Sequence, residues 1–189
     1  MRLLEDRIRR DGKLGAGDVL RVDSFLNHQI DVVLMDKLAD EFFRLFSSEK
    51  VDKVLTVEAS GIAIAALTAL KFGVPMVFAK KSKTSNITDN VYAAEAYSYT
   101  HQKTNTLIVS KDYIQPGEGV LLVDDFLANG QALLALKSLV DQAGGKAVGA
   151  GVLIEKAFQE GHGLLEKAGV RVEALARVAG MDESGVKFL

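Results

Sequence analysis

The sequence contains no cysteine among its 189 residues, and it has only three histidines. The absence of cysteine excludes a disulfide framework, a thiolate nucleophile and a cysteine-ligated zinc site. Because a chain without cysteine fits the reducing cytosol, we expect a cytoplasmic protein.

An excess of positive charge is also missing. The chain carries 23 Lys and Arg residues against 25 Asp and Glu residues, which gives a formal net charge of -2. No overall positive field therefore attracts a polyanion, and nucleic acid is not expected as a partner. A small anionic ligand could still be held locally.

Long apolar runs are absent as well. The longest, GIAIAALTAL at residues 61–70, is far shorter than the roughly 20 residues that a membrane-spanning helix needs. The N-terminal MRLLEDRIRRDGK mixes both signs of charge too early for a secretory signal. We therefore expect no association with a membrane.

What the chain does contain is enough apolar material for one compact core. Hydrophobic residues make up 48% of the sequence and charged residues 25%, as in ordinary soluble domains. A length of 189 residues suits one α/β domain and is short for two, so residues 1–189 are predicted to form a single domain.

Helical periodicity marks the N-terminal part. Apolar residues recur at helical spacing through residues 1–10 and 30–45, which predicts two amphipathic helices. The segment between them, residues 12–29, combines three glycines with short apolar bursts. It is expected to be ordered but irregular, and to pack onto the rest of the domain.

From residue 53 the pattern changes to short β-branched runs that alternate with helical stretches. KVLTV, GIAIAALTALKFG and VPMVFA form a βαβ unit and so predict parallel strands. Residues 80–105 are polar and too long for an ordinary connection, which indicates a lid or flap. Further strands are expected at TLIVS, VLLVDD and AVGAGVLIE, helices at QALLALKSLVDQAGG and HGLLEKAG, and an edge strand at VRVEALARV.

Polar side chains follow the predicted parallel strands where ligands bind in such sheets. Asp124 and Asp125 come directly after VLLV, and two buried carboxylates need hydrogen-bond donors or a cation. Residues 128–132 then place small and amide side chains at a helix start, where unpaired N–H groups favour a phosphate. The alternatives are two solvated acidic residues and an Asn129 that merely caps the helix.

Residues 120–132, VLLVDDFLANGQA, resemble the phosphoribosyl-diphosphate signature of the type I phosphoribosyltransferases. The resemblance extends over the whole chain to the bacterial xanthine phosphoribosyltransferases. The stretches that carry it are, in this order, MRLLEDRI, LRVDSFLNHQID, KVLTVEASGIAIA and VLIEKAFQ. The resemblance implies an α/β fold with a mainly parallel central sheet flanked by helices, a flexible flap and a small hood. The implied boundaries are a hood at about residues 1–36, a core at about 37–189 and a flap at about 81–105.

The resemblance also implies which residues bind the sugar donor. Asp124 and Asp125 would hold the ribose hydroxyls and serve as the catalytic pair, and a loop would wrap the 5-phosphate. Ser60 could otherwise be an ordinary helix cap, and the lysines near residue 81 a solvated surface. The implied phosphate loop is Ala128, Asn129, Gly130, Gln131 and Ala132, and the implied diphosphate loop is Ala59, Ser60 and Gly61 with Lys81.

For the purine, the resemblance points to Leu20, Asn27 and Lys156, with Phe158 placed to stack on the ring. Lys156 has three N–H donors and no acceptor, so it suits the oxygens of an oxopurine and not the amino group of adenine. Leu20 and Phe158 could equally be core residues. Some oxopurine transferases have an acidic general base three positions after the second Asp, and this sequence has Ala128 there.

The reaction implied is transfer of the phosphoribosyl group from phosphoribosyl diphosphate to xanthine in purine salvage. Mg²⁺ is the implied cofactor, bound mainly through the diphosphate with no ligand set of its own on the protein, and a homodimer is expected. Hypoxanthine or guanine is an alternative substrate. A regulator that binds nucleic acid is less favoured, because the chain has no excess of basic residues. A dinucleotide-binding site is also less favoured, because the G-x-G-x-x-G motif is missing.

Overall fold

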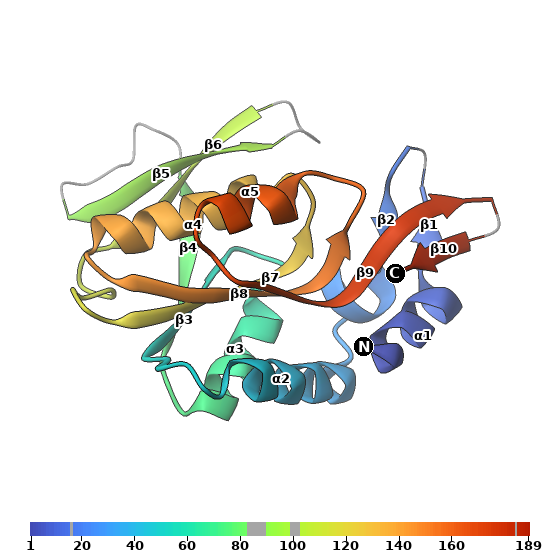
Figure 1. The fold of residues 1–189 in the computed structure, drawn as a ribbon, viewed down its shortest axis with the longest axis horizontal. Helices are drawn as coiled ribbons and strands as arrows, with labels where there is room; N and C mark the ends of the chain where they lie inside the picture. The colour runs from blue at the N-terminus through green and yellow to red at the C-terminus, as the bar shows by residue number, and fades with distance from the viewer. Residues whose placement is uncertain (16, 83–89, 99–102, 184) are drawn as a thin grey trace.

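The computed structural model describes residues 1–15, 17–82, 90–98, 103–183 and 185–189. These residues form one central sheet of eight strands in the order β10-β9-β8-β7-β3-β4-β6-β5, with helices on both faces and a hood at one end (Figure 1). The strands are β3 (Lys53–Val57), β4 (Met76–Ser82), β5 (Val91–Ser98), β6 (Lys103–Ser110), β7 (Gly119–Leu127), β8 (Lys146–Lys156), β9 (Val172–Asp182) and β10 (Gly185–Phe188).

The centre of the sheet is parallel, as the βαβ pattern predicts. β3 pairs in parallel with both β4 and β7, and β8 pairs in parallel with both β7 and β9. β3 is buried along its whole length, because parallel strands are covered by helices on both faces. The carboxyl ends of these strands therefore meet along one edge, where ligands bind in open α/β sheets.

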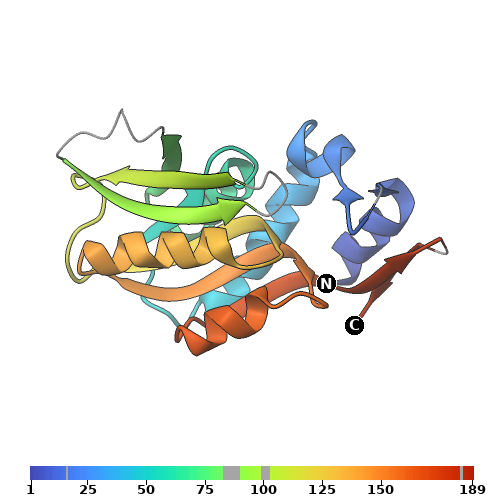
Figure 2. The ribbon, with the colours of Figure 1, turned by 90° about the horizontal axis from the view of Figure 1, so that it is seen from above.

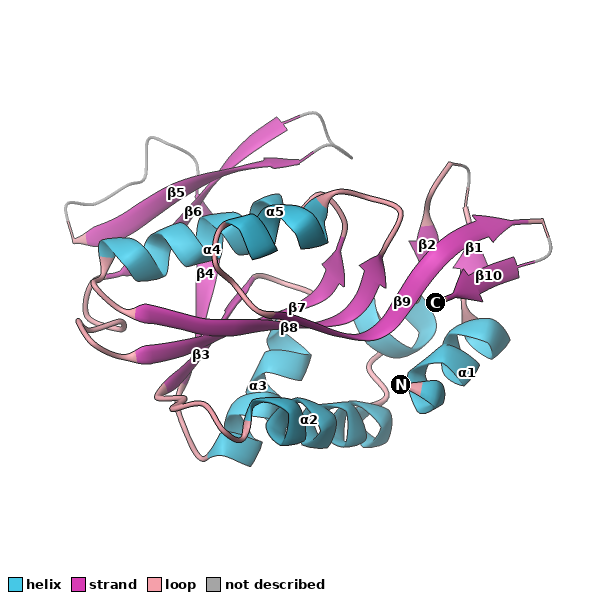
Figure 3. Ribbon diagram, viewed as in Figure 1, coloured by secondary structure: helices cyan, strands magenta, loops and turns pink. Residues whose placement is uncertain are grey.

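Two helical layers cover the sheet (Figure 3). α4 (Gln131–Gln142) and α5 (Gly161–Lys167) lie on one face, and α2 (Val32–Phe46) and α3 (Ile62–Phe72) on the other. α2 is amphipathic, and its N-cap Asp31 accepts a hydrogen bond from the Leu34 N–H at 3.0 Å. α3 ends at Gly73, whose φ of 68° is the left-handed conformation that closes helices.

The hood is built from both ends of the chain, which lie close together in the figures (Figures 1 and 2). It contains α1 (Arg2–Asp11), a small ribbon of β1 (Lys13–Leu14) and β2 (Leu20–Arg21), and the π-helical turn η1 (Asp23–Asn27), beside the C-terminal β10. Arg7 joins α1 to the start of α2 through an ion pair with Asp31 at 2.6 Å. The irregular segment expected between the first two helices is thus packed, as predicted.

Three predicted details are wrong. β9 is not an edge strand, because residues 185–188 turn back and pair with it antiparallel. β4 continues through Lys80 and Lys81 as a strand, since these residues pair with β6 instead of forming a loop. β7 likewise runs on to Leu127, two residues beyond the end of the predicted strand VLLVDD.

The predicted flap falls partly outside the described residues. Of residues 81–105, positions 83–89 and 99–102 are not described, Asn90 forms a turn, and the others belong to β4, β5 and β6. β5 and β6 form an antiparallel pair that extends the sheet beside α4. No helix among the described residues is long and apolar enough to cross a membrane.

Candidate active site

A cavity of about 260 Å³ opens where β3, β4 and β7 end. It brings together residues that are far apart in the sequence, including both aspartates, part of the predicted diphosphate loop and the start of α4. The cavity is lined by Val57, Glu58, Ser60, Lys81, Ala96, Tyr97, Asn105, Leu107, Asp124, Asp125 and Ala132.

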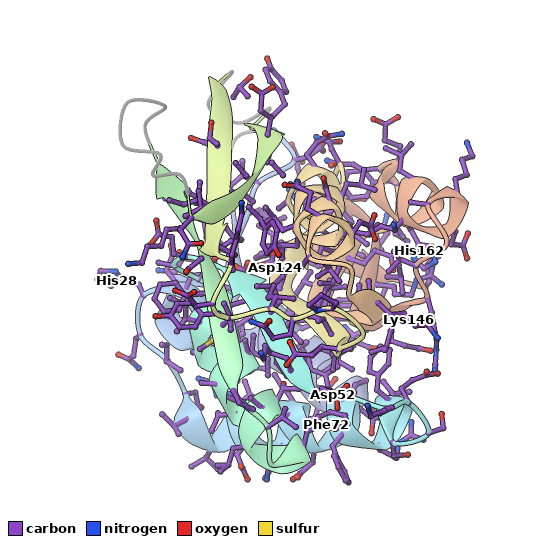
Figure 4. All side chains as sticks on the ribbon, turned by 90° about the vertical axis from the view of Figure 1, so that its left-hand side faces the viewer. His28, Asp52, Phe72, Asp124, Lys146 and His162 are labelled. Carbon is purple, nitrogen blue, oxygen red and sulfur yellow. The ribbon has the colours of Figure 1, made fainter. Side chains whose placement is uncertain are left out.

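The two aspartates are buried side by side in this wall. Asp124 is 5% exposed and Asp125 7%, and the Asp125 N–H donates to Asp124 Oδ1 at 2.9 Å. Burial raises the pKa of the Asp124 carboxyl well above its usual range, and the charge of Asp125 adds to this effect while that of Lys81 opposes it. Figure 4 shows Asp124 in the interior of the molecule. A buried acidic pair of this kind is poised to accept hydroxyl donors or a cation.

The predicted phosphate loop, residues 128–132, leaves the start of α4 open. The N-cap of α4 is Gly130 in the left-handed conformation (φ 76°), and no side chain caps the helix. The alternative in which Asn129 caps α4 is therefore wrong. Uncapped N–H groups and the helix dipole at this end favour an anion, and Ala132 in the same turn adjoins the cavity.

The diphosphate loop is a turn between β3 and α3. Glu58, which directly precedes Ala59, accepts a hydrogen bond at Oε1 from the Lys81 N–H at 2.6 Å, and this bond ties the predicted loop to β4. The Glu58–Ala59 peptide bond is cis. The N-cap of α3 is Gly61, without a side-chain cap, so Ser60 is not the ordinary helix cap of the alternative interpretation.

Gly61 lies too close to its neighbours for any side chain. A Cβ there would collide with Thr56 Oγ1 and lie 3.0 Å from Asp124 Oδ1. The hydroxyl of Thr56 is buried and has no hydrogen-bond partner among the described residues. This close approach explains why the loop needs glycine at this position, since the backbone of Gly61 has ordinary helical angles (φ -71°).

Lys156 lies at the junction of the core and the hood. Its Nζ donates to the carbonyl oxygen of Asp18 at 2.5 Å, two residues before the buried Leu20. Burial lowers the pKa of Lys156, and the nearby charge of Asp18 opposes this shift. Asn27 is exposed at the end of η1, and Phe158 is 40% exposed. The structure thus brings Lys156 to the hood, but none of the four predicted purine residues lines the 260 Å³ cavity.

Several cavity residues were not found from the sequence. Tyr97 on β5 and Asn105 on β6 line the cavity, although residues 80–105 were interpreted only as a flap. The weak alternation of residues 91–98 was the available signal for a strand with one face toward a ligand.

The donor atoms fit a magnesium ion that is carried by a substrate. Among the described residues no group of three or more His, Asp or Glu side chains gathers to hold a metal. The carboxylates of Asp124 and Asp125 are hard oxygen ligands of the kind that Mg²⁺ prefers, and this ion usually takes one or two carboxylates together with substrate phosphates. The pair can therefore support such an ion but not enclose it.

This geometry is that of a nucleotide-forming transferase, and the comparisons agree. Residues 21–172 match the family model described as phosphoribosyl transferase domain, and the chain belongs to this family. A xanthine phosphoribosyltransferase of Bacillus cereus (strain AH187) is 49% identical over 189 residues, which are 100% of this chain and 96% of the relative.

Solved structures confirm the fold. An adenine phosphoribosyltransferase from Rhodothermus marinus superposes with a TM-score of 0.76 at 23% identity, covering 94% of this chain and 99% of its own. An APRTase from Giardia lamblia gives a TM-score of 0.78 at 23% identity, with coverages of 94% and 98%. The α/β fold with a mainly parallel sheet, predicted from the resemblance, is therefore confirmed.

Proposed function

We propose that the protein transfers the 5-phosphoribosyl group from phosphoribosyl diphosphate to xanthine, giving XMP and diphosphate, in purine salvage. The observation that carries the proposal is the buried Asp124–Asp125 pair, which is followed within the same β-α connection by an uncapped helix start. Identity of 49% over the full length with a xanthine phosphoribosyltransferase supports this choice of substrate.

The sugar donor would be held from three directions. Asp124 and Asp125 would accept hydrogen bonds from the ribose hydroxyls. The N–H groups of residues 128–132 would surround the 5-phosphate, since the loop has little bulk to keep it away. Ala59, Ser60 and Gly61 would approach the diphosphate, with the charge of Lys81 nearby. Mg²⁺ bound to the diphosphate and supported by the Asp pair would make the diphosphate a better leaving group.

The purine would bind between the hood and the end of β8. Leu20 and Phe158 would supply apolar contact, Asn27 would read a ring edge, and Lys156 would donate to the exocyclic oxygens. As the bond to diphosphate lengthens, positive charge develops on the ribose, and the purine nitrogen attacks from the opposite face. Because Ala128 stands where a carboxylate base could be, the purine proton would leave to solvent or to the diphosphate.

A product assay tests the proposal. Purified protein with phosphoribosyl diphosphate and Mg²⁺ is given xanthine, guanine, hypoxanthine or adenine, and the nucleotides are separated and quantified. We expect xanthine to have the highest kcat/KM and adenine the lowest, and a chelator to abolish turnover. Asp124→Asn and Asp125→Asn serve as site controls. Adenine as the best substrate would contradict the role of Lys156, and full activity of both variants would contradict the ribose assignment.

We also propose that the active form is a homodimer. α3 is apolar on nearly all sides, and Leu70 is 70% exposed on it, while Phe78 on the neighbouring β4 is 37% exposed. A helix that is apolar all round is normally covered. Light scattering should give twice the chain mass, and Leu70→Glu should give the monomer mass; a wild-type monomer would contradict the proposal.

For localisation we propose the cytoplasm, on the absence of cysteine and of a membrane-spanning helix among the described residues. Cell fractionation with an antibody tests it, and recovery in the membrane or secreted fraction would contradict it.

A further inference from the structure

A buried carboxylate lies next to Lys156 but outside the cavity. Glu155, the penultimate residue of β8, is 1% exposed. Its Oε2 accepts from Arg177 Nε at 2.9 Å and its Oε1 from Arg177 Nη2 at 3.3 Å. Glu155 and Arg177 are also partners in the register of β8 and β9. The carboxylate is therefore held in two-point contact with the guanidinium of the adjacent strand.

A third side chain reaches Glu155 from α5. His162 Nδ1 is buried and lies 3.1 Å from Glu155 Oε1, and His162 Nε2 lies 3.4 Å from Glu166 Oε1. Nδ1 is not aligned for a hydrogen bond, so the contact is one of charge when the imidazole is protonated. Figure 4 shows His162 at α5, away from Asp124. We call Glu155, Arg177 and His162 the Glu155 cluster; it joins β8, β9 and α5.

The cluster holds both ends of the turn that carries Lys156. Directly after Lys156, the Ala157 N–H donates to the Val178 carbonyl at 2.8 Å, and the Gln159 N–H donates back to the Lys156 carbonyl at 2.9 Å. The turn then enters α5, which His162 ties to Glu155. The backbone of Lys156 is thus fixed on two sides, and its ammonium meets the Asp18 carbonyl on the third.

Stability alone does not account for the cluster. Burying the Glu155 carboxylate costs desolvation, and an apolar side chain of similar volume often stabilises a fold as well or better. This desolvation cost falls on Glu155, the residue that directly precedes Lys156. A fixed lysine position is what an ionic cluster provides and an apolar contact does not.

We infer that Glu155 is a positioning residue that acts through the Glu155 cluster to set the place of the Lys156 ammonium for the purine. The inference rests on the proposed role of Lys156 in binding xanthine. Glu155 itself touches neither substrate, so its loss should act on purine binding through Lys156 and not on the sugar-donor site.

A double-mutant cycle tests this coupling. Steady-state kinetics are measured for wild type, Glu155→Gln, Lys156→Met and the double variant. We expect Glu155→Gln to raise the KM for xanthine about tenfold, the order expected when a binding group is misplaced, with little change in the KM for phosphoribosyl diphosphate. In the Lys156→Met background the same substitution should have almost no effect on the KM for xanthine.

A matched control separates positioning from stability. Glu118 also pairs with a buried cation, Lys53, at 2.9 Å, but at the start of β3 and away from the carboxyl ends of the strands. Glu118→Gln should lower the melting temperature and leave the KM for xanthine unchanged. If Glu155→Gln does not fold, Arg177→Gln replaces it, because Arg177 is 46% exposed and its loss leaves His162 beside the carboxylate.

Two results would overturn the inference: an unchanged KM for xanthine in Glu155→Gln, or an equal rise with and without Lys156. Failure of the proposed function would look different. Wild-type protein would then not convert xanthine, and the same cycle would be run with the purine that it does convert.

Discussion

Asp124 is a single residue whose burial favours ligand binding at the expense of stability. Burial raises the pKa of this carboxyl and the charge of Asp125 adds to the shift, so the folded protein keeps the proton to higher pH than the unfolded chain does. Between the unfolded and the folded pKa the folded state binds more protons, and stability falls as pH rises through this window. Above the unfolded pKa, the burial of Asp124 therefore costs the ligand-free protein stability.

Asp124→Asn should for this reason stabilise the ligand-free protein while abolishing transfer activity. The amide oxygen can still accept the Asp125 N–H, and the charge is gone. We expect a gain of about 1 kcal/mol at neutral pH, equivalent to a rise in Tm of about 2 to 4 °C for a chain of this size. Thermal melts across pH measure it. The gain should vanish below the unfolded pKa, and a variant less stable than wild type at every pH would disprove this account.

Among the elements, α5 is short but supports the phosphate loop. The Gly161 N–H donates to the Ala128 carbonyl at 3.1 Å. A Cβ on Gly161 would collide with that carbonyl oxygen and lie 2.7 Å from the Gly130 nitrogen. The start of α5 and the start of α4 are therefore in backbone contact, and neither can shift without the other.

Gly161→Ala should displace the phosphate loop and raise the KM for phosphoribosyl diphosphate about tenfold, because small misplacements of binding groups are costly. Gly163→Ala is the matched control, since a Cβ at Gly163 meets nothing within 4 Å. Initial rates at varied donor concentration measure the effect. Equal KM values for phosphoribosyl diphosphate in the two variants would show that the contact between α5 and α4 does not affect donor binding.

Elements with a strong local pattern were predictable and those that depend on distant partners were not. The β-branched runs at β3 and β7 and the periodicity of α2 carry their own signal. β5 alternates only weakly, and β10 has only four residues, so each becomes a strand through its partner. The same holds for the site. Asp124 and Asp125 can be recognised from the sequence as a motif, whereas the ion pair of Glu155 depends on Arg177, 22 residues away, and could not be predicted.

At the scale of the whole molecule, the hood is continuous with the apolar interior of the core. One apolar cluster joins α1, α2 and α3 with the hood side of the sheet, and a second lies under α4 beside β5 and β6. The proposed purine residues come from both parts of the molecule, with Leu20 and Asn27 in the hood and Lys156 at the end of β8 in the core. Occupation of the site should therefore stabilise the whole fold.

Phosphoribosyl diphosphate with Mg²⁺ should raise the Tm. At a concentration about 100 times the dissociation constant, the gain is about 2.7 kcal/mol, or a rise of about 5 to 10 °C. Differential scanning calorimetry measures it, and excess chelator should remove most of the shift. Asp124→Asn should respond weakly to the donor. A shift that chelator leaves untouched would contradict a metal-assisted donor site.

The hydrogen bond from Lys156 to the Asp18 carbonyl has a consequence for selectivity. One of the three ammonium N–H groups is already occupied, and burial has removed part of the water from the other two. The oxygens of an oxopurine would accept hydrogen bonds from those two donors. Adenine would place an amino group opposite them, so the two donors would have neither an acceptor nor water. Rejection by such an unmet donor is far stronger than rejection by a missing apolar contact, on the order of 10⁴-fold against 10²-fold. Selectivity for the base would then come mainly from the cost of leaving Lys156 N–H donors without an acceptor when adenine binds, and less from attraction of the preferred purine.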